Sequence, residues 1–190
     1  MVNHLKIEVS PNPEFDDFPD HQARIIVDGQ DWLGTETIGL DPPDLDEQLS
    51  QKDQMIVGRC PCGEMGCGDL VVEVQRTDKT IRWLDSDGVE AVFDTQQFDA
   101  EVDRFRKDHS WETLERRVER EVGPIFKGIV IDKEYRFSWV SARSEPCKIR
   151  VCFQGHKNGI LLDFDWDGET VSDALQRAQQ FLIEHVLPRA

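Results

Sequence analysis

Short runs of alternating apolar and polar residues over residues 55–94 most constrain how this chain can fold. Four such runs, among them one with Leu70, Val72 and Val74 on a single face, are separated by connections rich in glycine and aspartate. Alternation with a period of two is typical of strands that bury one face, and tight connections join antiparallel neighbours. This region therefore predicts an antiparallel meander.

Two amphipathic helices are expected after the meander, at 95–110 and 110–123. In each, apolar residues recur at helical spacing and form one stripe opposite a charged face. Ser110 is expected to cap the second helix, and the pair Gly123-Pro124 is expected to end it. Both segments have the pattern of surface helices that pack on a sheet.

The last third repeats this plan of strands followed by a helix. Strands are expected at 134–143, 147–154 and 159–168, and two further strands near the N-terminus at 5–9 and 23–27. Thr170 and Asp173 have the spacing of a capping box at the start of a long C-terminal helix. The expected fold class is α+β, with antiparallel sheet meanders, two central helices and a long C-terminal helix. We expect one domain over 1–190, or alternatively two packed units of about 1–123 and 124–190.

The charge of the chain limits its partners. Its 190 residues include 38 Asp and Glu against 22 Lys and Arg, which gives a formal net charge of -16. Such a field repels phosphate backbones and anionic membranes and attracts basic proteins. We therefore expect no nucleic-acid or membrane partner, and favour a basic protein partner. Trp32, which lies among polar residues on no periodic face, is a candidate for the partner surface.

The N-terminal residues show no secretory signal, and no apolar run is long enough to span a membrane. A cytoplasmic location is therefore expected. In a reducing compartment, the five cysteines would be thiols or metal ligands before they would be disulfides.

Cys60, Cys62 and Cys67 lie in the glycine-rich stretch CPCGEMGCG, with the spacing C-x-C-x4-C. The favoured interpretation is a structural hairpin loop, in which Gly63 and its neighbouring glycines allow a compact turn. A zinc-type site is the second interpretation, because thiolates bind zinc, although four ligands are usual and only three are present. A disulfide or redox pair is the third.

Cys147 and Cys152 are the remaining cysteines that could supply a fourth ligand. In the expected strand 147–154 they fall on opposite faces, Cys147 with the apolar residues and Cys152 with Lys148 and Arg150. Both are therefore not expected to reach one metal ion.

Other motifs give little support for a site. The stretch DFDWDG at 163–168 resembles the opening of a calcium loop, but Ala174 stands where the bidentate glutamate is needed. No nucleophile or phosphate-loop motif is present, so catalytic residues are not assigned. Four tryptophans lie on apolar faces and are expected in the core, namely Trp83, Trp111, Trp139 and Trp166.

The loop and its flanks, over roughly residues 55–120, resemble a family of uncharacterised, mostly actinobacterial proteins with a C-x-C-G-x-x-G-C-G loop. The resemblance implies a shared loop and no known activity. We expect a non-catalytic, acidic interaction or regulatory protein of the inhibitor or immunity type, without a cofactor. The alternative is a protein with a structural or redox-sensing zinc site at Cys60, Cys62 and Cys67, and a small hydrolase is the third possibility.

Overall fold

The structure is a computed structural model that describes residues 2–12, 21–62 and 66–190. The chain forms two compact units, Met1–Trp111 and Glu112–Ala190. The division falls twelve residues before the boundary near 123 in the two-unit alternative, because the second central helix packs with the C-terminal sheet and helix. Each unit is described by itself.

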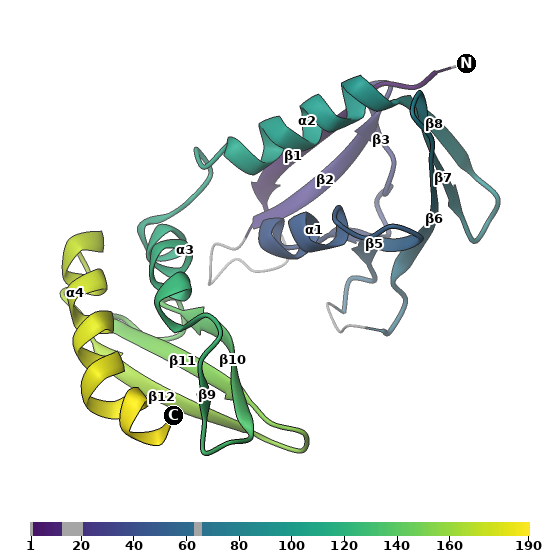
Figure 1. The fold of residues 1–190 in the computed structure, drawn as a ribbon. Coiled ribbons are helices and arrows are strands. Elements are labelled where there is room, and N and C mark those ends of the chain that lie inside the picture. The colour runs from purple at the N-terminus through teal and green to yellow at the C-terminus, as the bar shows by residue number, and fades with distance from the viewer. Residues whose placement is uncertain (1, 13–20, 63–65) are drawn as a thin grey trace. The chain divides into compact units, whose positions relative to one another are not determined.

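The first unit contains two antiparallel sheets (Figure 1). Its elements are β1 (Leu5–Pro11), β2 (His21–Val27), β3 (Gln30–Asp31), β4 (Ile38–Gly39), α1 (Pro42–Gln48), β5 (Gln54–Arg59), β6 (Leu70–Arg76), β7 (Thr80–Asp85), β8 (Glu90–Asp94) and α2 (Thr95–Lys107). One sheet has the order β1-β2-β3 and the other β4-β5-β6-β7-β8. The expected meander over 55–94 is therefore confirmed as β5 to β8.

The two sheets of the first unit share one core. Single bridges connect them at both ends, from Asn3 to Phe93 in β8 and from Ala23 in β2 to Leu40. Trp83 is fully buried at the centre, where Phe93 contacts it edge-on at a centroid distance of 4.9 Å. The alternating apolar positions of the meander thus face a closed interior, as their period predicts.

Helix α2 covers part of this core with the stripe of Phe98, Val102 and Phe105, all buried. Asp94 caps the helix, because its carboxylate accepts hydrogen bonds from the backbone N–H groups of Gln96 and Gln97. The helix predicted at 95–110 is confirmed, and it ends at Lys107.

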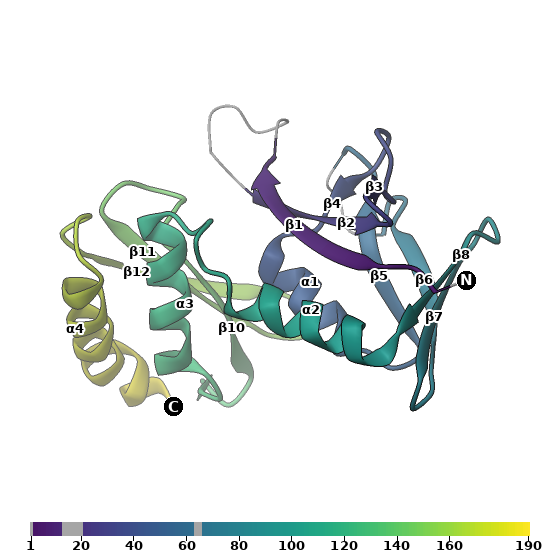
Figure 2. The same ribbon diagram turned by 90° about the horizontal axis from the view of Figure 1, so that it is seen from above.

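The second unit has two helices on one four-stranded antiparallel sheet, in the order β12-β11-β10-β9. Its elements are α3 (Leu114–Phe126), β9 (Val130–Ile131), β10 (Tyr135–Ser141), β11 (Lys148–Gln154), β12 (Gly159–Asp165) and α4 (Val171–Phe181), followed by a π-helical turn (Leu182–Val186) and a 3-10 turn (Leu187–Arg189). Helices α3 and α4 lie side by side (Figure 2) and bury their apolar faces against the sheet in a separate core.

Both ends of the second central helix differ from the prediction. Thr113, not Ser110, caps α3, because its hydroxyl accepts the N–H of Arg116. The helix also continues through Gly123 and Pro124 to Phe126. A proline in the last turn removes only one helical hydrogen bond, so burial of Phe126 in the core outweighs that loss.

The core prediction for Trp139 was wrong, because this side chain is 44% exposed. The pairing of β10 with β11 shifts register between Phe137 and Trp139. Such an irregularity reverses the face on which the following residues point. Trp83 and Trp166 are buried as expected, and Trp111 is half-buried.

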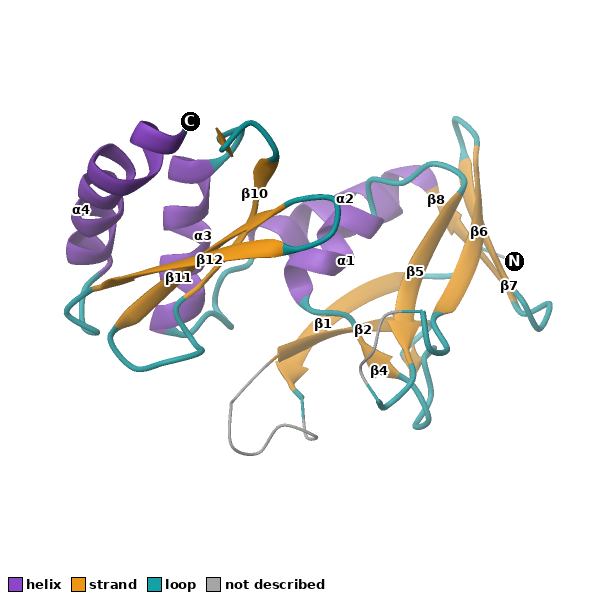
Figure 3. Cartoon of the chain, turned by 90° about the horizontal axis from the view of Figure 1, so that it is seen from below, coloured by secondary structure: helices purple, strands orange, loops and turns teal. Residues whose placement is uncertain are grey.

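The capping box at the start of α4 is confirmed in part. The Thr170 hydroxyl accepts the N–H of Asp173, whereas the Asp173 carboxylate accepts the N–H of Asp167. Figure 3 shows the resulting arrangement of antiparallel strands and separate helices, which confirms the α+β class with two central helices and a C-terminal helix. Over the described residues, no helix has the length and apolarity required to cross a bilayer.

Candidate functional site

The cysteine loop connects β5 and β6 at one end of their hairpin (Figure 3). The two strands pair antiparallel, with Met55 opposite Val72 and Gly58 opposite Leu70. The pairing holds the two ends of the loop together, so that cysteines separated in sequence can converge. The pairing confirms that this stretch connects two neighbouring antiparallel strands.

The three cysteines form one cluster. Their sulfur atoms all lie within 4.8 Å of one another, and the Sγ atoms of Cys60 and Cys62 are 2.7 Å apart. Cys60 is half-buried, whereas Cys62 and Cys67 are exposed. Over the described residues, this is the one group of three or more His, Cys, Asp or Glu side chains whose ligand atoms converge in this way.

Glycine and aspartate shape the return of the loop toward β6. Gly66 and Gly68 adopt φ angles of 82° and 134°, which side chains rarely tolerate. The Gly66 N–H donates to the Asp69 carboxylate at 3.0 Å, and a Cβ atom at position 68 would lie 3.3 Å from that of Cys60. Gly63, the third glycine of the predicted turn, lies outside the described residues. This return of the chain places the Cys67 sulfur atom close to those of Cys60 and Cys62.

The cluster raises the pKa of the Cys67 thiol to about 11. Hydrogen bonding of this thiol with Cys62 is the largest cause, hydrogen bonding with Cys60 is the second, and the nearby sulfur charges add to both. A negative thiolate is disfavoured beside two further sulfurs unless a cation neutralises it. With this pKa, the Cys67 thiol keeps its proton at neutral pH.

The donor set fits a soft metal ion. Zinc binds thiolates at about 2.3 Å, which places sulfurs of a tetrahedral site about 3.8 Å apart. The Cys60 and Cys62 sulfur atoms lie closer together than this distance, and every pair of sulfur atoms in the cluster lies within 4.8 Å. Small shifts of the side chains would therefore bring the three sulfur atoms to the spacing of a zinc site. Cys60, Cys62 and Cys67 would hold the ion after release of their protons, and the fourth position would open to solvent.

Cys147 and Cys152 both lie in the second unit and do not belong to this cluster. The Cys147 sulfur lies 3.9 Å from the Asp167 carbonyl oxygen, and this residue adopts a φ of 56°, outside β11. Cys152 is buried, and burial raises the pKa of its thiol. The predicted alternation of their faces was therefore wrong, because Cys147 is not part of the strand.

Trp32 lies against the core of the first unit. It is half-buried, its ring centroid is 5.7 Å from that of Trp83, and its backbone N–H donates to the Ile25 carbonyl at 2.9 Å. Part of its ring surface is thus used in packing on the core, and only the remainder could contact a partner.

Asp163 and Asp167 of the DFDWDG stretch have structural partners instead of a common centre. Asp163 forms an ion pair with Arg150 at 2.9 Å across the sheet. Asp167 accepts hydrogen bonds from the N–H groups of Glu169 and Thr170, and from the Thr170 hydroxyl at 2.6 Å. Strand pairing and helix capping therefore account for the positions of these two aspartates.

Asp69 is a residue that the cysteine spacing does not single out. Its carboxylate pins Gly66, so it sets where Cys67 lies relative to the other two cysteines. An aspartate placed three residues after a glycine is a turn signal, and that pattern would have identified it. Comparisons with protein-family models, curated proteins and solved structures found no match for this chain.

Proposed function

We propose that Cys60, Cys62 and Cys67 form an exchangeable thiolate site for a soft metal ion, with zinc as the favoured ion, in a non-catalytic regulatory protein. The observation that supports the proposal is the convergence of the three sulfur atoms within 4.8 Å of one another. Thiolate sets of this kind select zinc, cuprous copper or iron–sulfur clusters over hard cations.

Solvent exposure favours exchange of the ion over a permanent structural role. Structural zinc sites are closed by four protein ligands, whereas open sites keep a position for water or another ligand. Two of the three cysteines are exposed, and the loop connects two strands that pair through backbone hydrogen bonds of their own. The first unit also has its own core, so its fold does not depend on the ion.

Bound zinc would change the local charge and mobility of the loop. The ion brings two positive charges and joins three positions of one turn, which restricts the backbone between β5 and β6. The affinity of any partner that contacts this end of the hairpin would therefore depend on whether zinc is bound.

Zinc titration of the reduced, untagged protein under anaerobic conditions tests the proposal. A chromophoric chelator as competitor should report one equivalent of zinc, bound with a dissociation constant below about 1 μM, and three protons or fewer released per ion. The triple variant Cys60→Ser, Cys62→Ser, Cys67→Ser should lose that equivalent while its circular dichroism stays that of the wild type.

Cys147→Ser is the matched control, because Cys147 is also exposed but lies outside the cluster. This variant should keep the full equivalent of zinc. Absence of zinc binding tighter than about 10 μM by the reduced wild type would refute the site. Equal loss in the Cys147→Ser variant would show that binding involves another set of thiols.

We propose as a second function that the first unit binds a basic protein. The supporting observation is the distribution of charge between the two units: residues 1–111 contain 25 acidic and 10 basic side chains, whereas residues 112–190 contain 13 and 12. Nearly the whole net charge of -16 thus belongs to the first unit. A field of one sign accelerates association with an oppositely charged partner.

Calorimetry with basic proteins encoded beside its gene tests this second function. Binding should be retained by the full chain, lost by residues 112–190 alone, and weakened at least about tenfold between 50 and 300 mM salt, because salt screens exposed charges. A complex that residues 112–190 form equally well, or one insensitive to salt, would contradict it.

A further inference from the structure

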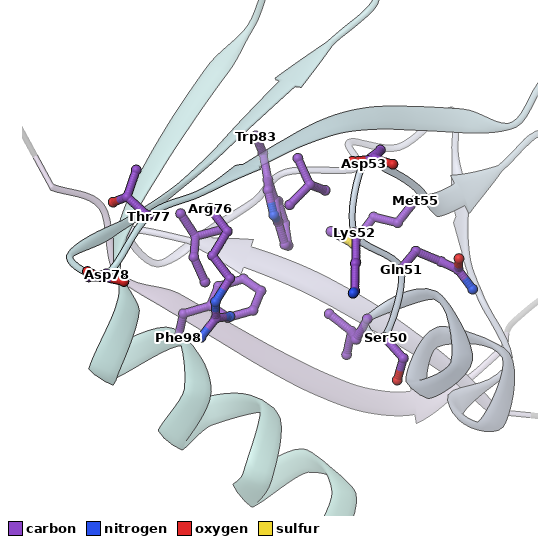
Figure 4. A pocket seen from close by; sticks show the side chains of 13 residues that line it. Ser50, Gln51, Lys52, Asp53, Met55, Arg76, Thr77, Asp78, Trp83 and Phe98 are labelled. Carbon is purple, nitrogen blue, oxygen red and sulfur yellow. The ribbon is translucent and has the colours of Figure 1, made fainter.

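The first unit contains a cavity of about 590 Å³ that belongs neither to the cysteine loop nor to the charge argument. One wall is the loop after α1, from Leu49 to Asp53, and the other is formed by β6, β7 and the turn between them (Figure 4). Its volume lies within the range of small-molecule sites.

The floor of the cavity is apolar and aromatic. It is formed by Met55, Ile81, Trp83 and Phe98, each no more than 6% exposed. Phe98 contacts the Trp83 ring edge-on, with centroids 5.5 Å apart at an interplanar angle of 87°. Such a floor favours a ligand with an apolar side chain, which would pack on the aromatic rings.

One buried donor at this floor is unused. The indole N–H of Trp83 has no hydrogen-bond partner among the described residues, although the side chain is fully buried. Trp83 is one of the residues that line the cavity, and Figure 4 shows its ring edge-on among the other lining side chains. In the same unit, the indole N–H of Trp111 donates to the Asp108 carbonyl at 2.9 Å. Buried donors in proteins rarely lack an acceptor. A ligand in this cavity that carries a hydrogen-bond acceptor would therefore satisfy the Trp83 indole N–H.

Trp166 in the second unit also has an indole nitrogen without a partner among the described residues. It lines neither this cavity nor the smaller one beside β1 and α2. Trp83 therefore differs in combining an unused donor with an adjoining space large enough for a ligand.

The rim of the cavity carries charged side chains of both signs. Lys52 and Asp53 come from the loop after α1, and Asp78 comes from the turn between β6 and β7. Among the described residues, no ion pair or hydrogen bond engages these three side chains. The guanidinium of Arg76, by contrast, is held by Asp99 at 2.6 Å. The unengaged charges match a ligand that has both a carboxylate and an ammonium group.

The net negative charge of the first unit disfavours a ligand that carries only negative charge. Residues 1–111 carry 15 more acidic than basic side chains, so a net anion would be repelled as it approached. A zwitterion meets no such net repulsion, and its two ends can use Lys52 and Asp78 separately.

We propose that this cavity binds a small zwitterion with an apolar side chain, of the class formed by apolar amino acids and dipeptides. The carboxylate of the ligand pairs with Lys52, its ammonium with Asp78 or Asp53, and its apolar side chain packs on Phe98 and Met55. A carbonyl oxygen, which a dipeptide has in its amide, accepts the Trp83 indole N–H.

Nuclear magnetic resonance of the full chain with ¹⁵N-labelled tryptophan tests the proposal directly. The five indole N–H signals, one for each tryptophan, are followed during titration with leucyl-phenylalanine. The Trp83 signal is assigned with the variant Trp83→Phe, or by elimination with the other four Trp→Phe variants. It should shift downfield until the site is saturated, with a dissociation constant below about 1 mM. Free phenylalanine, 3-phenylpropanoate and phenethylamine are the comparison ligands.

Lys52→Met should weaken dipeptide binding about tenfold or more, which corresponds to about 1.4 kcal/mol. Lys107→Met is the matched control, since Lys107 is an exposed lysine on α2 outside the cavity, and should change the affinity less than about twofold. No saturable shift of the Trp83 signal at about 10 mM dipeptide would overturn the site. Equal effects of the two lysine variants, or equal binding of 3-phenylpropanoate, would overturn the zwitterion assignment.

Discussion

Replacement of Glu101 by alanine should destabilise the first unit more than any other loss of a single carboxylate on α2. Glu101 is only 9% exposed, and its carboxylate accepts the backbone N–H of Ile7 in β1 at 2.6 Å. Arg104 donates to the same carboxylate at 2.6 and 2.8 Å and also to the Ile7 carbonyl. This pair of side chains therefore satisfies both the backbone N–H and the backbone carbonyl of Ile7 in β1.

The expected loss of stability follows from the groups left behind. Glu101→Ala leaves the buried Ile7 N–H without an acceptor, which costs about 1–3 kcal/mol, and removes charge-assisted bonds to Arg104. The Arg104 side chain is 44% exposed and can rehydrate, so it adds little. We expect a decrease of about 2–3 kcal/mol in the free energy of unfolding, and about 1 kcal/mol for Glu101→Gln, which keeps an acceptor.

Urea unfolding followed by tryptophan fluorescence and circular dichroism measures these changes. Asp103→Ala is the control on the same helix, since Asp103 is exposed, and should stay within about 0.5 kcal/mol of the wild type. If Glu101→Ala changes the unfolding free energy no more than Asp103→Ala does, the reasoning about the buried Ile7 N–H is refuted.

The same contact predicts a pH dependence. Burial raises the pKa of Glu101, but the hydrogen bonds from Arg104 and Ile7 outweigh burial, so the pKa is lowered overall. A carboxyl whose pKa is lower in the folded state contributes stability that is present above its unfolded pKa, about 4.3. The stability difference between wild type and Glu101→Gln should therefore be full at pH 7, and it should shrink as the pH falls from the unfolded pKa through the lower folded pKa.

Three further outcomes are expected. Gly39→Ala should cost at least about 3 kcal/mol, because its Cβ would lie 2.2 Å from the Ala23 carbonyl oxygen. Gly123→Ala should instead stabilise α3 by up to about 1 kcal/mol, because its Cβ would meet no other described atom within 4 Å beyond its chain neighbours and the backbone of its own helix; thermal melts compare the two variants. In native protein, Cys147 should react with a thiol reagent much faster than buried Cys152, whose pKa is raised by burial, as mass spectrometry of a time course would show. Residues 112–190 produced alone should unfold cooperatively, because their core is separate from that of the first unit, and a non-cooperative melt would contradict this.

Local patterns in the sequence determined the classes and most positions of the regular elements. Alternation predicts β5 to β8 and β10 to β12, since one face of each strand packs on a core, and helical spacing predicts α2, α3 and α4. The hairpin at the cysteine loop follows from two flanking strands and a glycine-rich connection. These features depend on neighbours along the chain and can therefore be read from it.

Features that depend on distant partners required the tertiary structure. The exposure of Trp139 results from a register shift between two strands, and the continuation of α3 past Pro124 results from burial of Phe126 in the second core. The boundary at 111–112 depends on which sheet α3 covers. Alternation and capping patterns carry no information about such packing, because they describe one element at a time.

The candidate sites show the same division. The spacing of Cys60, Cys62 and Cys67 identified three thiols in one loop, but only the folded turn, with Asp69 holding Gly66, brings their sulfur atoms together. The unpartnered indole of Trp83 has no counterpart in the sequence, where this residue is one apolar position in a strand. Convergence of side chains and satisfaction of buried polar groups are properties of three-dimensional packing, so only the tertiary structure decided them.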